Sequence, residues 1–451
     1  MHTLEQLRSG QLAGTTHLHL AADLTEFPAE IFTLADSLEV LNLSGNRLTA
    51  LPDNLHRLHR LRILFCSDNQ FTAVPVVLGR CAQLSMVGFK ANQIRTLPAA
   101  ALPPALRWLI LTDNQLEALP AEIGNCPQLQ KLMLAGNRLR ALPATLARCT
   151  RLELLRIAAN ELTELPAWLL TMPRLTWLAY AGNPFCAATE AAGAHYPIGT
   201  IDWASLEIGA QLGEGASGVI YRAEWQPAAD AAPTAVAVKL FKGALTSDGL
   251  PHSEMAACIS AGFHPNLIGV EGQVGGHPRG AQGLVLALID PEFRNLAGPP
   301  SFASCTRDVY APDVAFELEA ALRIAQGIAA AAAHLHARGI LHGDLYAHNI
   351  LTTPAGDALL GDFGAAGFFD LADQPVARAL QQLEVRAFAC LLEELLDRCA
   401  GPAASASTFL VLQSLQQRCA SPHPADRPLF AEIQQTLTAV QQVTEPIGRG
   451  L

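Results

Sequence analysis

A leucine pattern repeated through residues 38–183 is the feature that most constrains the fold of this chain. Leu38–Asn46 reads Leu-x-x-Leu-x-Leu-x-x-Asn, and the unit restarts at intervals of 22 or 23 residues. A unit this short cannot bury its own apolar residues, whereas stacked units share one core. The alternating leucines predict one short strand per unit with its leucines facing inward. The repeat therefore predicts an α/β solenoid with a curved parallel sheet.

An asparagine closes each unit, and in most units a proline follows it. The asparagines are Asn46, Asn69, Asn92, Asn114, Asn137, Asn160 and Asn183. A buried asparagine ladder can bond backbone groups that each turn leaves unpaired. The pattern resembles the leucine-rich repeat family, and we expect residues 1–186 to form such a solenoid.

The side chains predicted to face the concave side of the sheet are mostly large and apolar. They are Val40, Ile63, Phe65, Met86, Trp108, Ile110, Leu154 and Trp177. An exposed apolar strip of this extent usually marks a partner site. We expect it to bind a protein substrate or regulator, or to dock on the second half of the chain. The alternative is that these residues only cover one another.

The repeat pattern stops after Phe185. Residues 187–200 are rich in alanine and glycine and predict a short linker to a second domain over 201–451. Within that domain, residues 342–349 read His-Gly-Asp-Leu-Tyr-Ala-His-Asn, and 361–364 read Gly-Asp-Phe-Gly. Phosphoryl transfer needs a base and oxygen ligands for magnesium, which these acids and the amide could supply. Either stretch alone would also fit an ordinary turn.

A glycine loop and a lysine precede these acids. The loop contains Gly213, Gly215 and Gly218. It lies between predicted strands at 206–212 and 219–225, where bare backbone amides can approach phosphates. Val-Ala-Val-Lys at 236–239 follows, and Glu254 in a predicted helix over 251–262 is a natural ion-pair partner for Lys239.

This order of landmarks, with His-Pro-Asn at 264–266 and Asp-Arg-Pro at 426–428, resembles the protein-kinase superfamily. The resemblance implies an α+β two-lobed kinase-like fold, with a small lobe at about 201–289 and a large lobe at about 290–451, and the use of ATP and Mg²⁺. It implies these roles: Asp344 as catalytic base, Lys239 with Glu254 on the phosphates, Gly213, Gly215 and Gly218 over them, Ile220, Ala237 and Leu351 around the adenine, and Asn349 and Asp362 on magnesium.

The sequence departs from the kinase pattern around the catalytic loop. Gly343 stands where many kinases have an arginine that pairs with a phosphate on the activation segment. Residues 365–386 contain no Ser, Thr or Tyr. The two absences together predict an enzyme that phosphorylation of this segment does not switch on. Tyr346 and His348 occupy positions where kinases often carry Lys or Arg, so a positive charge on the transferred phosphate is not assured.

Two alternatives stay open beside a Ser/Thr protein kinase. His-Gly-Asp-Leu also resembles the catalytic loop of small-molecule kinases that act on aminoglycosides or choline. A nucleotide-binding pseudokinase scaffold is the other alternative, and the intact set of Lys239, Glu254, Asp344, Asn349 and Asp362 disfavours it. The glycine loop and the fused repeats favour a protein substrate.

Composition narrows the remaining possibilities. The net charge of −11 over 451 residues argues against a general nucleic-acid surface. No basic N-terminal stretch leads into an apolar one, and no apolar run reaches the about 18 residues of a membrane span, so we expect a cytoplasmic protein. The Ala-rich, Lys-poor composition suggests a GC-rich bacterial genome, so the chain as a whole resembles a bacterial-type leucine-rich repeat protein kinase.

Overall fold

The computed structural model describes residues 1–193, 198–215, 217–228, 230–243, 245–246, 248–399 and 406–444. The chain divides into two compact units. The first contains Met1–Leu175 and Asn183–Phe185, and the second contains Thr176–Gly182 and Cys186–Leu451. Part of the last repeat, residues 176–182, is therefore grouped with the downstream half of the chain. Each unit is described by itself.

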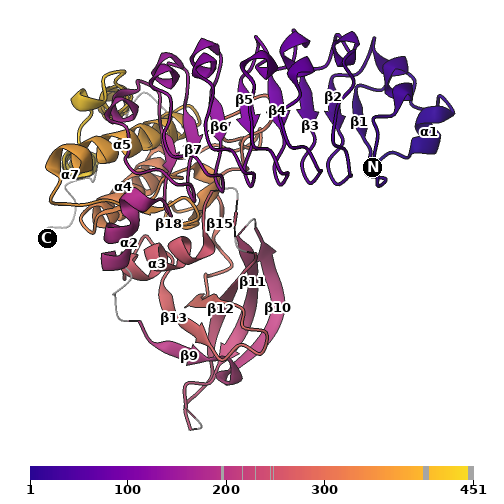
Figure 1. Cartoon of the computed structure of the whole chain (residues 1–451). Helices are drawn as coiled ribbons and strands as arrows, with labels where there is room; N and C mark the ends of the chain where they lie inside the picture. The colour runs from indigo at the N-terminus through magenta and orange to yellow at the C-terminus, as the bar shows by residue number, and fades with distance from the viewer. Residues whose placement is uncertain are drawn as a thin grey trace, which may run out of the picture. The chain divides into compact units, whose positions relative to one another are not determined.

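The first unit is built from short parallel strands, one for each repeat (Figure 1). They are β1 (His17–His19), β2 (Val40–Asn42), β3 (Ile63–Phe65), β4 (Met86–Gly88), β5 (Trp108–Ile110), β6 (Lys131–Met133) and β7 (Leu154–Arg156), in chain order. Strand β8 (Trp177–Ala179) continues this order, although its residues belong to the second unit. Helix α1 (Leu4–Arg8) opens the chain and is capped by the Thr3 side chain. The predicted solenoid with a parallel sheet is confirmed.

Short 3-10 helices lead the chain back between the strands. They are η1 (Ala29–Leu34), η2 (Leu55–Arg57), η3 (Val76–Arg80), η4 (Ala99–Ala101), η5 (Ala121–Asn125), η6 (Ala144–Arg148), η7 (Ala167–Thr171) and η8 (Pro184–Cys186). A proline precedes most of them in an extended conformation, as Pro120 does with φ −66° and ψ 145°. The fixed φ of proline suits this entry, and a repeat of 22 or 23 residues leaves room for only a few helical residues.

The asparagine ladder binds each repeat to its neighbour. Asn114 Oδ1 accepts a hydrogen bond from the Ile94 amide at 2.9 Å, and its Nδ2 donates to the Phe89 carbonyl at 2.8 Å. The side chain is also within 3.1 Å of the Leu111 carbonyl, to which it donates. Backbone groups of two successive repeats thus find partners on one buried amide.

Replacement of a central ladder residue tests this arrangement. Asn114→Leu removes the partners of these buried backbone groups, and we expect the free energy of unfolding to fall by about 1–3 kcal/mol. Urea unfolding followed by circular dichroism measures the change. Asn125→Leu, on an exposed residue of η5, is the matched control. An Asn114→Leu midpoint equal to that of the control would contradict the ladder.

The predicted apolar strip on the sheet is largely covered. Val40, Ile63, Phe65, Trp108 and Ile110 are half-buried. Met86, Leu154 and Trp177 are buried, each with 2% of its surface exposed. The strip is therefore exposed only in part, because sequence alternation assigns a face to a residue but does not show what packs over it.

The β-rich part of the second unit is a six-stranded sheet in the order β10-β11-β12-β14-β13-β9. Its strands are β9 (Thr200–Asp202), β10 (Leu206–Glu214), β11 (Gly218–Trp225), β12 (Thr234–Phe241), β13 (Val270–Gly275) and β14 (Gly283–Ala287). Helix α3 (Pro251–Ala261) begins with a proline at its first position, where a missing N–H costs nothing, and it ends before Gly262 at a φ of 63°. Helix α2 (Ala187–Gly193) occupies the first part of the predicted linker.

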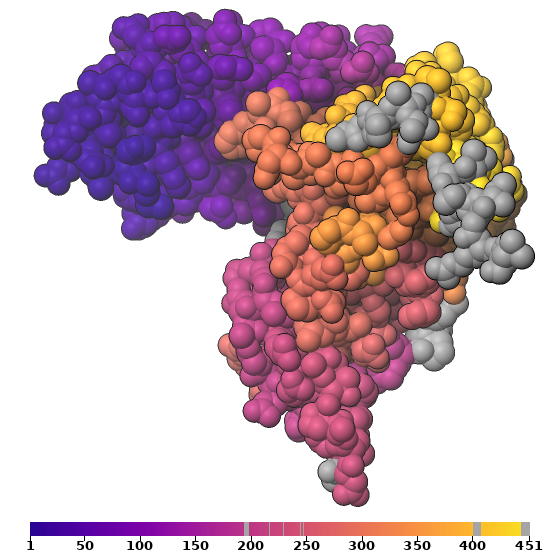
Figure 2. Space-filling view, turned by 180° about the vertical axis from the view of Figure 1, so that it is seen from behind, coloured from indigo at the N-terminus to yellow at the C-terminus, as the bar shows by residue number. Residues whose placement is uncertain are grey.

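The remainder of the second unit is mainly helical. Its helices are α4 (Leu318–His336), α5 (Gln374–Leu396), α6 (Ala406–Cys419) and α7 (Phe430–Thr444), with 3-10 turns η9 (Trp203–Ser205), η10 (Ala347–Asn349) and η12 (Pro424–Asp426). Two small sheets accompany them: β15 (Arg294–Asn295), β17 (Ile350–Thr352) and β18 (Ala358–Leu360), and β16 (Ile340–Leu341) with β19 (Gly367–Phe368). The alanines of α4 are mostly buried, as expected for core packing. Figure 2 shows the surface of this part of the chain, from orange to yellow, from the opposite side.

Candidate active site

One face of the six-stranded sheet carries three of the predicted nucleotide-site residues. Ile220 on β11 lies directly opposite Lys239 on β12, and Ala237 is two residues before Lys239. Residues opposed in an antiparallel pair, and residues two apart on one strand, project from the same face. Val236 and Val238 project from the other face into a core with Val285. Ile220, Ala237 and Lys239 therefore share one surface.

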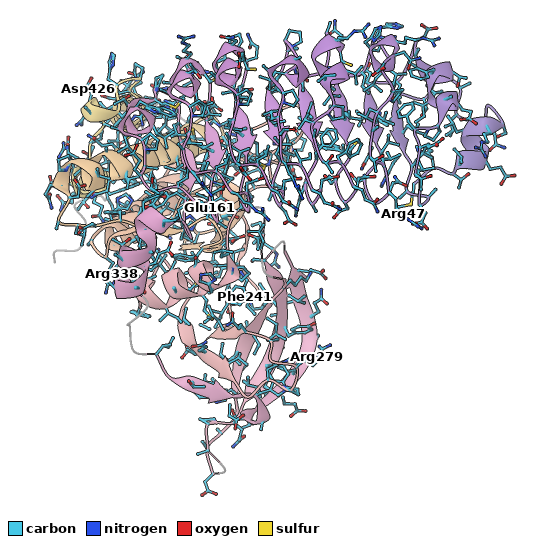
Figure 3. The ribbon with its side chains drawn as sticks, viewed as in Figure 1. Arg47, Glu161, Phe241, Arg279, Arg338 and Asp426 are labelled. Carbon is cyan, nitrogen blue, oxygen red and sulfur yellow. The ribbon has the colours of Figure 1, made fainter. Side chains whose placement is uncertain are left out.

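Lys239 forms an ion pair with Glu254 of α3, as the sequence predicts. Its Nζ contacts Glu254 Oε1, and the side chains are 13% and 2% exposed. The ammonium also lies 5.3 Å from the ring of Phe241, labelled in Figure 3. Burial opposes its charge, but the carboxylates of Glu254 and Asp362 outweigh burial and raise the pKa of Lys239. The lysine stays a cation at neutral pH.

The glycine loop closes the hairpin between β10 and β11. The Gly215 amide donates to the Gly218 carbonyl at 2.9 Å. An added Cβ at Gly218 would lie 2.6 Å from the Leu240 carbonyl oxygen, so close packing requires glycine there. At Gly213 and Gly215 an added Cβ would meet no atom within 4 Å. Packing within the chain does not explain these two glycines, whereas close approach of a ligand to their backbone would.

Asp362 lies near the lysine pair in the left-handed backbone region, with a φ of 54°. Its Oδ1 accepts a hydrogen bond from the Gly364 amide at 3.1 Å, and its side chain is exposed. A Cβ on Gly364 would lie 3.8 Å from Glu254 Oε2, which places this turn beside α3. In the described part of the chain, no group of three or more His, Cys, Asp and Glu residues could hold a metal ion. A magnesium ion here would rely on Asp362, Asn349, phosphate oxygens and water, which is its usual manner of binding in proteins.

The catalytic-loop acid and amide are bonded to each other. Asn349 Nδ2 donates to Asp344 Oδ2 at 2.8 Å and to the Asp344 carbonyl at 2.9 Å. This use of the amide nitrogen leaves the Asn349 amide oxygen as the atom that could face a cation. The Asn349 carbonyl accepts the Gly361 amide at 3.0 Å, and this bond ties the loop to the Gly-Asp-Phe-Gly turn. Leu351 follows on β17 and is half-buried.

Glu384 anchors the backbone of the catalytic loop, a contact that the sequence did not reveal. It lies within α5 and is 2% exposed. Its Oε1 accepts the Gly343 amide at 2.7 Å, and its Oε2 accepts the His342 amide at 3.3 Å. His336 Nε2 lies 2.7 Å from Oε2. Burial opposes the charge, but these donors outweigh it and lower the pKa of Glu384.

His348 lies close to the two acids and is held by a third, Asp308. Its Nδ1 lies 2.7 Å from Asp308 Oδ1, and its amide donates to Asp308 Oδ2 at 2.9 Å. Burial alone would lower the pKa of His348, but Asp308, followed by Asp344 and Asp362, raises it. The sequence marked this position as uncertain in charge because the partner, Asp308, lies 40 residues away in the chain.

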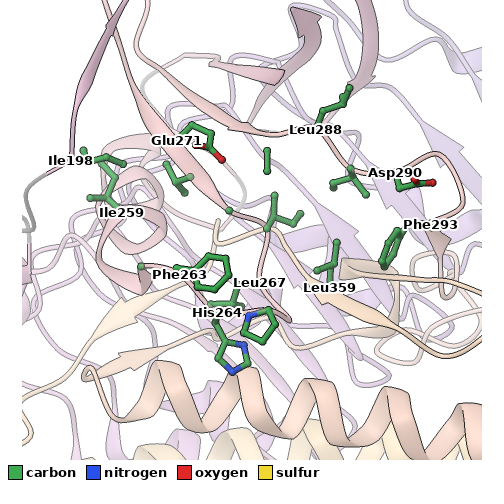
Figure 4. A pocket seen from close by; sticks show the side chains of 17 residues that line it. Ile198, Ile259, Phe263, His264, Leu267, Glu271, Leu288, Asp290, Phe293 and Leu359 are labelled. Carbon is green, nitrogen blue, oxygen red and sulfur yellow. The ribbon is translucent and has the colours of Figure 1, made fainter. Parts of the chain in front are cut away.

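A cavity of about 620 Å³ is lined in part by residues 287–290, where the small lobe is predicted to meet the large lobe (Figure 4). Phe263, His264 and Leu267 line its other side. Of the described residues, none of those predicted to hold phosphate or magnesium lines this cavity. It is therefore distinct from the place where Lys239, Glu254 and Asp362 meet.

Comparison with known proteins is consistent with both halves of this description. The model of the protein tyrosine and serine/threonine kinase family matches residues 206–399, and a model of leucine-rich repeats matches residues 36–99. A probable serine/threonine-protein kinase of Arabidopsis thaliana is 27% identical over 108 residues. The alignment covers 24% of this chain and only 13% of that relative. None of these matches supports the bacterial-type assignment.

The described helices include none that is both long and apolar enough to cross a bilayer.

The kinase match begins at the first residue of β10 and ends just beyond α5, so it includes the glycine loop, the Lys239–Glu254 pair, the catalytic loop and Glu384. Residues 206–399 form a protein kinase domain, and the same chain carries leucine-rich repeats before it.

Proposed function

We propose that this chain is an ATP- and magnesium-dependent protein kinase that phosphorylates Ser or Thr, with its repeats selecting a protein substrate or regulator. The observation that carries the proposal is the paired arrangement of Lys239 with Glu254 and of Asp344 with Asn349. The Asp362 carboxylate helps to raise the pKa of Lys239 in the first pair. In the chain, Asp362 comes after the second pair, and the antiparallel strands β17 and β18 lie between them. The match to a protein kinase model and the serine/threonine kinase relative support the same conclusion.

The residues then take the following parts in the reaction. Lys239 would bind the nucleotide phosphates, and the glycine loop would cover them with backbone amides. Ile220, Ala237 and Leu351 would pack around the adenine. Asn349 and Asp362 would hold Mg²⁺, which neutralises charge on the phosphates.

Asp344 would orient the substrate hydroxyl and accept its proton. The hydroxyl oxygen forms a bond to the γ-phosphorus as the bond to the bridging oxygen of ADP breaks. ADP then leaves with the electron pair of that bond. Asp308 raises the pKa of His348, and whenever this histidine is protonated it would stabilise the negative charge on the transferred phosphate.

A turnover assay with Mg-ATP and a generic protein substrate tests the enzyme against the scaffold alternative. Asp362→Ala should lower kcat by about 10²–10³, the usual cost of losing one electrostatic contact to the transferring group. Asp370→Ala, on an exposed residue of the same segment, is the matched control. Nucleotide binding without turnover by the wild-type chain would favour the scaffold.

The acceptor is tested in the same assay. Ser- and Thr-containing peptides are compared with Tyr-containing peptides, an amino-sugar and choline. We expect transfer to a peptide, because the kinase model that matches 206–399 describes enzymes acting on proteins. Ser and Thr are preferred over Tyr because the similar Arabidopsis thaliana protein is a probable serine/threonine-protein kinase. Transfer to the amino-sugar or choline alone would replace the proposal with a small-molecule phosphotransferase.

The repeats are proposed to hold a protein through the half-buried members of the apolar strip: Val40, Ile63, Phe65, Trp108 and Ile110. Trp108 is the natural anchor, and the Lys131 ammonium lies 4.2 Å from its ring. A cytoplasmic location belongs to this proposal, supported by the ten cysteines of the chain, all of which are free thiols.

Trp108→Ala tests the strip. Loss of a tryptophan anchor costs about 2 kcal/mol of binding free energy, so we expect the KM for a whole-protein substrate to rise at least about tenfold. The KM for a short peptide should not change. Trp168→Ala, on the half-buried Trp168 of η7, is the control. An unchanged KM for every protein substrate would contradict the proposed strip.

A further inference from the structure

The segment Trp177–Tyr180, called the 177–180 segment below, packs on the catalytic loop within the second unit. The Trp177 ring is stacked on the Tyr346 ring, with centroids 4.1 Å apart and an angle of 7° between the planes. The Trp177 indole N–H donates to the Leu345 carbonyl at 3.2 Å. These contacts fix the two residues that directly follow Asp344. Both rings are buried, with Tyr346 5% exposed.

The same segment also contacts the chain just after the Asp-Phe-Gly turn. The Tyr180 hydroxyl donates to the Phe368 carbonyl at 3.1 Å. An added Cβ at Gly367 would lie 2.9 Å from the Tyr180 ring, which shows how closely the ring lies on this strand. Gly367 pairs with Leu341, so β19 is in turn joined to the strand that leads into the catalytic loop. Two successive aromatic anchors thus fix both stretches that carry the predicted acids.

The backbone conformation and the close neighbours of Gly343 explain why no arginine stands at this position. Its φ is +72°, and an added Cβ would lie 2.6 Å from the carbonyl oxygens of both Leu178 and Ala365. Any larger residue would strain the backbone and displace the 177–180 segment. The Leu178 carbonyl of this segment is therefore one of three features, with the positive φ and the Ala365 carbonyl, that exclude an arginine at position 343. The stretch 365–386, which the segment contacts, has no hydroxyl that could be phosphorylated.

We propose that the 177–180 segment is a built-in positioning element for the active site, with Trp177 and Tyr180 as positioning residues. It orders the catalytic loop and the segment after Asp-Phe-Gly without any covalent modification. The segment does not cover the predicted acids, because Asp344 is half-buried and Asp362 is exposed. Trp177 and Tyr180 are only 2% and 1% exposed. Such burial is typical of permanent core packing and not of a segment that binds reversibly as an inhibitor. The catalytic part of this inference rests on the proposed function.

The test uses the full chain with three variants and two readouts. Trp177→Ala removes the stacking ring and the indole donor, Trp177→Phe keeps a ring on Tyr346, and Tyr180→Phe removes one hydroxyl. Hydrogen–deuterium exchange is measured over 340–347 and 364–370, and kcat and the KM for ATP are measured in parallel. Trp168→Ala, on another tryptophan of the last repeat, is the control.

We expect Trp177→Ala to increase exchange in both stretches and to lower kcat about 10–100-fold, because a displacement of about 1 Å in a catalytic group has effects of this size. The KM for ATP should stay within about twofold, since Lys239 and Glu254 are untouched. Trp177→Phe should recover most of the kcat, and Tyr180→Phe should increase exchange over 364–370.

Unchanged exchange and unchanged kcat in folded Trp177→Ala would overturn the inference. A rise in kcat would also overturn it, because the segment would then inhibit. If Trp177→Ala does not fold, Tyr180→Phe decides by the same readouts. If the wild-type chain transfers no phosphate, the proposed function fails, whereas the exchange measurement still tests the positioning by itself.

Discussion

Asp344→Asn should lower kcat by about 10²–10⁴, the range for loss of a positioned general base, while nucleotide binding is spared. The change is nearly isosteric, and the new amide side chain could keep a hydrogen bond with Asn349 through its own oxygen. The charge that accepts the proton of the substrate hydroxyl is lost. Lys239 and Glu254, which would bind the phosphates, are untouched. Steady-state kinetics and titration with a fluorescent ATP analogue measure the two effects separately.

Asp313→Asn, on an exposed residue of the same unit, controls for the general effect of removing one negative charge. An equal kcat for Asp344→Asn and this control would refute the role of Asp344 as the base. A variant that loses nucleotide affinity as well as turnover would instead indicate that the loop between Asp344 and Asn349 collapses without its carboxylate.

Local patterns in the sequence were sufficient for much of the fold. The repeat predicts the parallel strands because each unit carries its own strand, turn and asparagine. The pairing of Lys239 with Glu254 was also predictable, since the order of strand, lysine and helix brings the two together. The predicted helix over 251–262 corresponds to α3, and the predicted strand at 206–212 to β10, which extends to Glu214.

The contacts that shape the catalytic loop were not predictable in the same way. Trp177 shares a period-2 position with Val40 and Ile63, and nothing in that pattern distinguishes it from them. Its partner Leu345 lies 168 residues further along the chain. The kinase resemblance drew attention to Gly343 as a departure, but its physical reasons, a positive φ and the close carbonyls of Leu178 and Ala365, are visible only in the structure. The roles of these residues depend on contacts between segments far apart in the chain, and a single sequence does not show which distant residues pack together.

Glu384 is the second residue for which we expect a large effect, in this case on stability. It is a buried carboxylate whose two oxygens accept the amides of His342 and Gly343 and face His336 Nε2. Glutamine keeps one acceptor oxygen but turns an NH2 group toward one of these buried donors, and a buried donor left without a partner costs about 1–3 kcal/mol. We therefore expect Glu384→Gln to lower the free energy of unfolding by about 1–3 kcal/mol near neutral pH.

The pH dependence of this effect has a definite sign. The pKa of Glu384 is lowered from its ordinary value of 4.5 by the His336, His342 and Gly343 donors, despite burial. A carboxylate with a lowered pKa stabilises the folded state above its unfolded pKa and loses this contribution as the pH falls through its folded pKa. The difference in unfolding free energy between wild type and Glu384→Gln should therefore be full near pH 7 and shrink below about pH 4.

Glu393→Gln is the matched control, because Glu393 lies on the same helix in a half-exposed ion pair with Arg307 and should contribute at most about 1 kcal/mol. Urea unfolding of the three proteins at a series of pH values gives the comparison. A Glu384→Gln effect no larger than that of Glu393→Gln would mean that the loop amides find other partners. A difference that grows as the pH falls would contradict the lowered pKa. Either result would remove Glu384 as the residue that holds the catalytic loop in place.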